Sequence, residues 1–509
     1  MNRSSRFALI AVTLLAMALV LLAGLSGAPD RNWDKWGRHE KQYEELTDAL
    51  LSGQLALKET PAAFLAETDN PYDPVERSVA AAEADSYALI DTAYYNGKYY
   101  TYFGVTPALL LYLPFRIVTG RMLPTWAAVI FLGVLTVPAC FFFVFSLRKR
   151  YYAESSGAVG ILLGILLVGA VGLPYLTAFC TTYSMPAVMG LFLSLTGLGI
   201  FLRAERPDGT LRRPCLLAGS VLLALTIGCR PVFAASYLLL FPIFLGAIRR
   251  GAFFRREKAS LTNTVIVLVP ALLLGSGFLT YNYLRFGNPL EFGFRYLFTT
   301  SDLLHSHLSV GASVESARLL LLQTPDLSTH FPFMVIFDYF GQYASELYVE
   351  PLFGGLLPLH PFLAAGLLLL IPTMLFSCVV KEKEETPAAG SPEQKKKAAP
   401  WGLALLSLIV AGVILATDAS IAGVSQRYES DFALFVFLPA TVSFLTLYEV
   451  LSDRRLCRIL LIVFLLLLTC AEVFLTFASI CCDGRYFAMR DWNPSAYNFL
   501  RNVIFGFLP

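Results

Sequence analysis

The sequence predicts an all-α integral membrane protein with about eleven transmembrane helices, its N-terminus inside the cell and its C-terminus outside. The first observation is composition: 56% of the residues are apolar and 15% are charged, whereas a soluble domain has about 25% charged residues. The second is a mean hydropathy of +0.62. The third is that basic clusters follow every second apolar run, as the positive-inside rule requires of cytoplasmic loops.

The apolar runs are long enough to cross a hydrocarbon core of about 30 Å. They are 7–27, 124–147, 156–175, 184–202, 214–229, 231–248, 261–283, 354–380, 401–418, 432–449 and 458–479. The basic clusters that orient them lie at 148–150, 203–213, 249–258, 381–397 and 454–458. The first run has roughly 21 apolar residues, which favours an uncleaved anchor over a cleaved signal peptide.

One further apolar stretch, 107–119, is too short to span. It predicts a helix that lies on the outer surface, capped by Thr106, started by Pro107 and ended by Gly120.

The runs 214–229 and 231–248 are joined only by Arg230 and Pro231. Two short spans or a re-entrant hairpin would both fit this pattern, and the choice leaves the orientation of the other spans unchanged.

The spans divide the chain into three parts. We expect an N-terminal module at 1–283 that includes an outer loop at 28–123, a second outer loop at 284–353, and a C-terminal part at 354–509 with a cytoplasmic linker at 381–400 and an outer tail at 480–509. The linker is charged and rich in Pro and Ala, which is typical of disorder. Long loops are usually functional or disordered, so the two outer loops are the natural places for a site.

The first outer loop contains recognisable local structure. Residues 42–53 form an amphipathic helix that Gly53 ends, and Asn96-Gly97 between aromatic runs predicts a β-hairpin. The tyrosines around this turn, Tyr99 and Tyr100 among them, are either an interfacial aromatic belt or a platform on which a sugar ring or an isoprenoid packs.

Four arginines lie at or near the outer ends of spans: Arg230, Arg285, Arg295 and Arg427. An arginine at the bilayer is costly and is by default a functional candidate. The planar fork of its guanidinium suits a phosphate or pyrophosphate. We expect these arginines to face one cavity near the outer leaflet, with contacts to lipid headgroups as the alternative for each one taken singly.

The order of these features resembles that of the GT-C superfamily of integral-membrane glycosyltransferases, which includes protein O-mannosyltransferases and the aminoarabinose transferase of lipid A. The resemblance rests on the tyrosine-led helix from Tyr43 to Gly53, the aromatic stretch and helix from Tyr99 to Leu110, and the Arg230-Pro231 junction. It covers the first seven spans. It implies transfer of a sugar from a polyprenyl-phosphate carrier to a glycan, lipid or protein acceptor, in the cell envelope at the outer face of the plasma membrane.

The sequence departs from the family at one important position. The family's catalytic acid usually lies about four residues before the tyrosine that opens the helix, and His39 stands there. By resemblance, the general base is then Asp34 or, second in order, Glu40, with His39 and Tyr43 near the substrate. Some members use a divalent metal, so a cluster of Asp34, Glu40 and Asp73 could hold one, although no spacing argues for it.

Two other function classes stay open, namely a non-catalytic lipid- or glycan-binding membrane protein and a transporter or flippase of lipid-linked sugars. A transporter would need charged residues spaced through several spans, and the sequence offers little beyond Asp418 and Glu472. There is no phosphate-binding loop, dinucleotide fingerprint, zinc-protease motif or nucleophile elbow, and nothing indicates nucleic acid as a partner.

Overall fold

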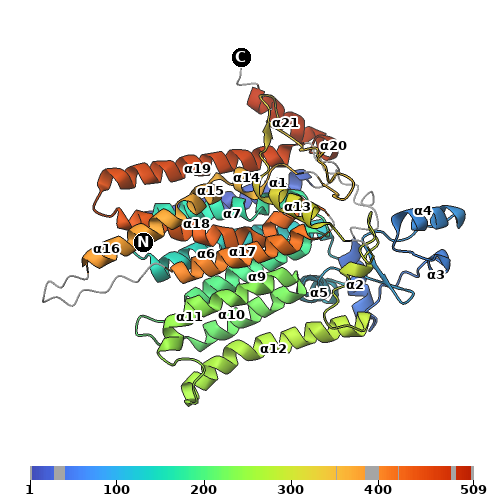
Figure 1. The fold of residues 1–509 in the computed structure, drawn as a ribbon, viewed down its shortest axis with the longest axis horizontal. Coiled ribbons are helices and arrows are strands. Elements are labelled where there is room, and N and C mark those ends of the chain that lie inside the picture. Colours follow the sequence, from blue (N-terminus) through green and yellow to red (C-terminus); the bar gives the residue numbers. More distant parts are fainter. Residues whose placement is uncertain are drawn as a thin grey trace.

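Eight helical segments are long and apolar enough to cross a membrane among the residues that the computed structural model describes. The described residues are 3–27, 41–305, 307–350, 352–384, 400–421, 423–482 and 489–505. The segments are α1 (Arg3–Gly27), α6 (Thr125–Tyr151), α9 (Ser184–Leu202), η5 (Pro231–Leu239) with α11 (Leu240–Arg249), α12 (Lys258–Phe286), α17 (Trp401–Ala419), η7 (Gln426–Tyr428) with α18 (Glu429–Val450), and α19 (Arg455–Cys481). They confirm the predicted multi-pass all-α membrane architecture (Figure 1).

The other three predicted runs form shorter or interrupted helices. They are α7 (Gly157–Ala170) followed by α8 (Leu173–Ala178), α10 (Arg213–Leu225) extended by η4 (Thr226–Gly228), and the series α14 (Leu356–Leu359), α15 (Pro361–Leu368) and α16 (Leu370–Glu384). Treating 354–380 as one continuous helix was wrong. His360 has φ −122° and ψ 77°, outside the helical region, because Pro361 disfavours a helical conformation in the residue before it.

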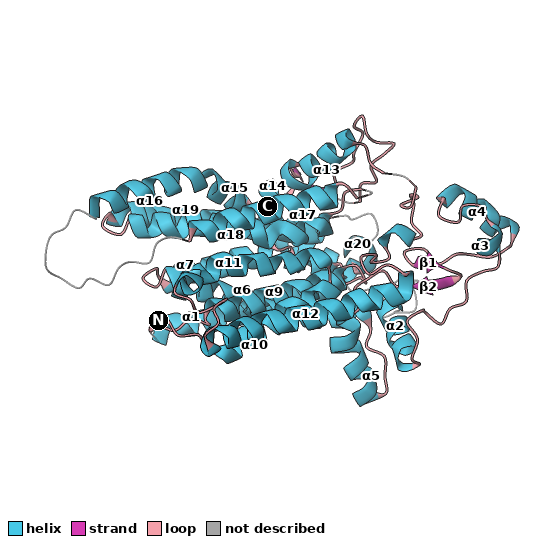
Figure 2. Cartoon of the chain, turned by 60° about the horizontal axis from the view of Figure 1, so that its bottom comes forward, coloured by secondary structure: helices cyan, strands magenta, loops and turns pink. Residues whose placement is uncertain are grey.

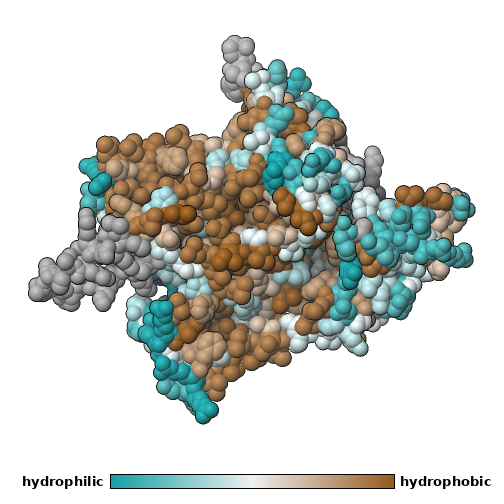
Figure 3. Space-filling model, in the orientation of Figure 1, coloured by the Kyte–Doolittle hydropathy of each residue, from teal (hydrophilic) through white to brown (hydrophobic). Residues whose placement is uncertain are grey.

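The long helices run side by side, and α18 lies in the middle of them. It packs against α17, α15, α16 and α7, and nearly all of its side chains are buried. By contrast α12 and α19 keep most of their apolar side chains exposed, as helices at the lipid boundary do. Figure 3 shows the resulting apolar surface between more polar ends.

The segment between α1 and α6, which the sequence predicts to be outside the cell and which we call the first outer segment, lies at one end of this bundle (Figure 2). It contains α2 (Gln42–Leu51), α3 (Phe64–Glu67), α4 (Pro74–Glu83), β1 (Ala93–Tyr95) and β2 (Lys98–Tyr100). The predicted hairpin is confirmed: β1 and β2 pair antiparallel, and Asn96 and Gly97 both have positive φ, 49° and 69°, as a two-residue turn between such strands needs.

The predicted short helix is also present, as η3 (Ala108–Tyr112) and α5 (Leu113–Thr119), and it ends at Gly120 with φ 69°. The cap assigned to Thr106 was wrong. The Thr106 hydroxyl instead donates to the carbonyl of Leu225, 2.8 Å away, and so ties the outer segment to the end of α10.

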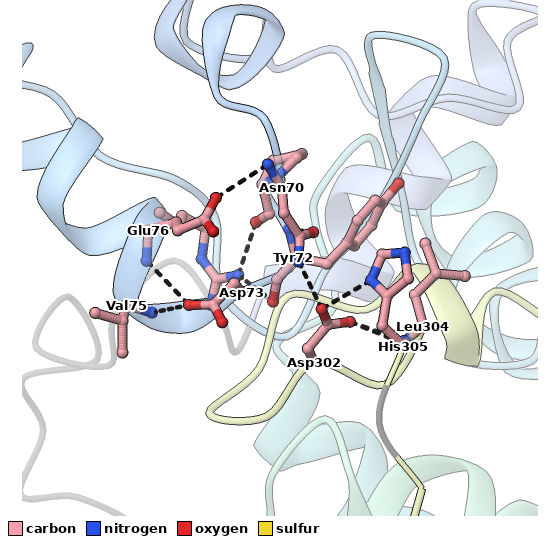
Figure 4. A network of polar contacts seen from close by, with 10 residues as sticks. Asn70, Tyr72, Asp73, Val75, Glu76, Asp302, Leu304 and His305 are labelled. Atoms are coloured by element: carbon pink, nitrogen blue, oxygen red, sulfur yellow. Dashed lines mark hydrogen bonds and ion pairs between the residues drawn. The ribbon is translucent and has the colours of Figure 1, made fainter.

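The second outer segment contains η6 (Phe294–Tyr296), α13 (Val310–Leu322), β3 (Asp326–Leu327) and β4 (Met334–Val335). It is joined to the first segment through Asp302 (Figure 4). The Asp302 carboxylate accepts from the Asn70 amide at 2.7 Å and lies 2.8 Å from Nδ1 of His305. The C-terminal helices α20 (Met489–Trp492) and α21 (Pro494–Phe505) follow α19. The linker predicted at 381–400 lies outside the described residues over 385–399.

The surface helix α2 is attached to the bundle by a carboxyl group with an unusual environment. Oε1 of Glu44 accepts from the backbone N–H of Thr125 at the start of α6, 3.1 Å away, while Oε2 is buried without a partner among the described residues. Burial raises the pKa of Glu44 from its usual 4.5 to about 8, against the opposing effect of the Thr125 hydrogen bond.

This environment predicts a pH-dependent contribution to stability. The folded state holds the Glu44 proton more tightly than the unfolded state, so the free energy of unfolding falls as pH rises from about 5 to about 8 and then levels off. We expect Glu44→Gln to flatten this slope and to raise the midpoint of thermal unfolding relative to wild type at pH 9 more than at pH 5. Glu83→Gln controls for the loss of an exposed acid. An unchanged slope in Glu44→Gln would contradict the prediction.

Candidate functional site

Arg230 stands at the break between two apolar helices. Because Pro231 cannot continue a helix from the preceding residue, Arg230 adopts an extended backbone, with φ −136° and ψ 123°. Its Nη1 lies 2.5 Å from both carboxylate oxygens of Asp431, a residue in the first turn of α18. Asp418 of α17 also acts electrostatically on this pair, and its Oδ2 has no hydrogen-bond partner among the described residues.

Arg427 reaches the same region from η7. Its Nη1 donates to Oε2 of Glu350 at 2.9 Å, and its guanidinium carbon lies 4.2 Å from the centre of the Tyr183 ring. Glu350 also accepts from the Ser425 hydroxyl at 2.6 Å, which fixes the carboxylate that faces Arg427.

Both guanidinium groups lie near the ring of Tyr428, at 5.9 Å for Arg230 and 5.4 Å for Arg427. Their side chains are 20% and 17% exposed. Each uses only Nη1 for its carboxylate, and the described residues give no hydrogen-bond partner to Nε or Nη2 of either arginine. Two partly exposed cations with unused, directional donors can bind an anion such as a phosphate.

Two further tyrosines, Tyr102 and Tyr183, complete what we call the arginine–tyrosine cluster: Arg230, Arg427, Tyr102, Tyr183 and Tyr428. The charges of Arg230 and Arg427 act on Tyr102. Burial nevertheless raises the pKa of Tyr102 well above its usual range, so its phenol stays protonated and can donate a hydrogen bond.

Asp91 is an acid in this region that the sequence reasoning did not single out. Its carboxylate is hydrogen-bonded to the Tyr183 hydroxyl and also acts electrostatically on Tyr102. Its backbone has φ 57°, a conformation that aspartate tolerates better than most residues. The Gln42 amide donates to the Asp91 carbonyl at 2.7 Å. In the sequence, the only sign of a role for Asp91 was its position just before the aromatic run that forms β1.

Gly104 brings the outer segment into direct contact with the break at Arg230. A Cβ at this position would come within 2.2 Å of the Gly228 carbonyl oxygen and 2.4 Å of the Cys229 oxygen. Only glycine therefore allows the backbone beside Tyr102 to approach the end of η4.

The predicted tyrosines lie in the core of the outer segment. Tyr43 is fully buried, stacks on Tyr112 at 5.2 Å between ring centres, and donates to the Gly104 carbonyl at 3.3 Å. Tyr99 and Tyr100 are also buried, and Tyr100 packs edge-on against Phe286. These buried rings are part of the packed interior of the outer segment and present little surface to a ligand.

The four predicted arginines divide into two groups. Arg230 and Arg427 lie together, as described. Arg285 is buried elsewhere, donating to the carbonyl of Thr101 at 2.7 Å and to Asn282 at 2.8 Å. Arg295 is exposed on η6. The structure thus brings two of the four together.

Three predicted site residues, Asp34, His39 and Glu40, lie outside the described residues. Asp73, the third acid of the possible metal cluster, caps α4 by accepting from the backbone of Val75 at 2.7 Å and of Glu76 at 3.0 Å. Within the described ranges, no group of three His, Cys, Asp or Glu side chains is placed to hold a metal ion.

Neither a family model nor a curated protein matches the chain. Among solved structures, it is similar to the crystal structure of ArnT from Cupriavidus metallidurans bound to undecaprenyl phosphate. The sequences are 13% identical and the TM-score is 0.42, with 98% of this chain and 81% of that chain covered. A similarity of this size defines neither the activity nor the site.

The Arg230–Asp431 pair predicts strong coupling between two distant parts of the chain. We expect Asp431→Leu and Arg230→Met each to lower the free energy of unfolding by roughly 3 kcal/mol. Each substitution removes one member of the pair and leaves the other charged side chain buried without a partner. The double variant should recover most of that loss. A double-mutant cycle of unfolding in detergent measures the coupling, with the exposed pair Glu315 and Arg318 as control, for which we expect below about 1 kcal/mol. Additive single effects at Arg230 and Asp431 would show that the pair is not coupled.

Proposed function

We propose that the protein is a glycosyltransferase that moves a sugar from a polyprenyl-phosphate carrier to an acceptor at the outer face of the plasma membrane. One observation carries the proposal. Arg230 and Arg427 lie near the same tyrosine ring, and the Nε and Nη2 donors of both have no hydrogen-bond partner among the described residues. A phosphate at a membrane surface, on a carrier whose chain stays in the bilayer, fits such a site.

In this reaction the acceptor hydroxyl oxygen forms a bond to the anomeric carbon of the sugar. The bond from that carbon to the phosphate oxygen breaks, and polyprenyl phosphate leaves with the electron pair. Arg230 and Arg427 stabilise the negative charge that develops on the phosphate, which is the kind of interaction that contributes most to catalysis of charged transition states.

A carboxylate takes the proton of the acceptor hydroxyl. The family resemblance proposes Asp34 and then Glu40 for this role. Asp91 is a third candidate, because it lies in the arginine–tyrosine cluster and its carboxylate contacts Tyr183. Tyr102 and Tyr183 would flank the sugar, since aromatic rings pack well against the apolar faces of pyranose rings.

The first test measures binding of a C55 polyprenyl phosphate to the purified protein in detergent. We expect Arg427→Met to weaken binding about 10- to 100-fold, because a charge-assisted hydrogen bond contributes about 1.5–3 kcal/mol. Arg318→Met, which removes an exposed arginine from α13, is the matched control and should bind as wild type does. If the wild-type protein binds no polyprenyl phosphate, the proposal fails.

The second test separates catalysis from binding. We expect the true base among Asp34→Asn, Glu40→Gln and Asp91→Asn to lose transfer from a polyprenyl-phosphate-linked sugar by about 10²-fold or more while keeping carrier affinity within about threefold. The assay follows release of labelled sugar over a panel of donors. Binding without turnover in wild type would favour the non-catalytic alternative, and movement of the intact donor across a vesicle membrane would favour the flippase.

A further inference from the structure

A large apolar groove, lined by none of the residues of the arginine–tyrosine cluster, lies between α1, α7, α19 and the C-terminal helices. Its volume is about 530 Å³. The side chains that line it are almost all apolar, among them Leu19, Val20, Leu166, Val473, Phe477 and Phe499. In Figure 1, α19 and α21 border this part of the molecule.

The walls of the groove identify the kind of molecule that can fill it. Both α1 and α19 are long and apolar enough to cross a membrane, and only a minority of their side chains are buried inside the protein. The solvent at that surface is the hydrocarbon of the bilayer, so a groove there is filled by a hydrocarbon chain. A volume of about 530 Å³ lies within the usual range for a ligand site, about 300–1,000 Å³.

One charged side chain lines this apolar groove. Glu472 of α19 is 2% exposed, and its Oε1 lies 3.2 Å from Nδ1 of His360. Its Oε2 is buried and has no hydrogen-bond partner among the described residues. Glu472 stands nine residues before Cys481, the last residue of α19, which places it about 13 Å from that end of the helix.

An unpartnered carboxylate oxygen at that depth is costly, because neither water nor lipid hydrocarbon supplies a donor there. His360 holds Oε1, and the backbone of Gly169 on α7 lies close against the same oxygen, since a Cβ there would come within 2.6 Å of it. The free acceptor is therefore fixed in position, as a recognition group needs to be.

We propose that this groove binds a membrane lipid that carries a hydroxyl or amide N–H within its hydrocarbon region and donates it to Oε2 of Glu472. An anionic lipid is disfavoured, because Glu472 is an acid and no Lys, Arg or His is among the described residues that line the groove. The groove shares no lining residue with the arginine–tyrosine cluster proposed to hold the carrier phosphate, and the inference does not depend on the proposed transfer reaction.

The test compares photoreactive probes in phosphatidylcholine nanodiscs that contain the wild-type protein. One probe is a diazirine-bearing hexadecanol, the second is the corresponding hexadecane without the hydroxyl, and the third is a photoreactive polyprenyl phosphate. At equal mole fraction, we expect the alcohol to label peptides of α1 and α19 about tenfold more than the alkane or the phosphate does. Equal labelling by alcohol and alkane would overturn the proposal, and so would stronger labelling by the phosphate.

Variants establish that the labelling comes from the groove. Val473→Trp fills the groove and should reduce labelling by the alcohol at least fivefold. Leu466→Trp adds the same side chain two turns away on α19, outside the groove, and should stay within twofold of wild type.

Glu472→Leu should abolish the preference for the alcohol. Because this variant removes a buried partner of His360 and could misfold, the probe preference of the wild type and the Val473→Trp result decide the question without it. Labelling that Val473→Trp leaves unchanged would overturn the proposal.

Discussion

The ion pair between Arg230 and Asp431 connects helices whose contacting residues are 201 positions apart in the chain. A guanidinium at the end of an apolar helix is stable only if it is paired, because the surrounding medium solvates charge poorly. Pro231 creates the break that frees Arg230 from the helix, and α18 supplies the carboxylate from the most buried helix of the bundle. The pair therefore joins the break at Pro231, which the outer segment contacts through Gly104, to the central helix α18.

The two carboxylates also explain how two arginine side chains can lie largely buried at the ends of apolar helices. Asp431 and Glu350 each occupy one nitrogen of their arginine and leave the other donors unused. The phosphate that we propose to bind here would therefore not need to displace either carboxylate, and the cost of desolvating the cations is already largely offset. Asp418 of α17 lies close enough to act electrostatically on the same pair, so a third helix contributes to the environment of Arg230.

Local patterns in the sequence predicted the parts of this structure that depend on local physics. The long spans follow from run length, and the hairpin follows from Asn96-Gly97, because only such residues adopt the backbone that a tight turn needs. The errors at Thr106 and His360 have different causes. Thr106 was assigned a local cap, whereas its hydroxyl bonds to a carbonyl over a hundred residues away. The break at His360 follows from a local rule, because Pro361 disfavours a helical conformation in the residue before it. The division of the arginines into two groups depends on tertiary packing that no spacing in the sequence reveals.

The contact at Gly104 gives a way to recognise divergent relatives of this chain. A methyl group there would overlap two backbone carbonyls, and backbone atoms cannot move aside as a flexible side chain can. In a homologue with an Arg-Pro pair at the position of Arg230, the outer segment can make the same backbone contact only if glycine stands at the position of Gly104. We therefore expect the two features to occur together. Joint occurrence of these two features, far apart in the sequence, is a more discriminating search criterion than overall identity, which falls quickly among lipid-facing residues that any apolar side chain can replace.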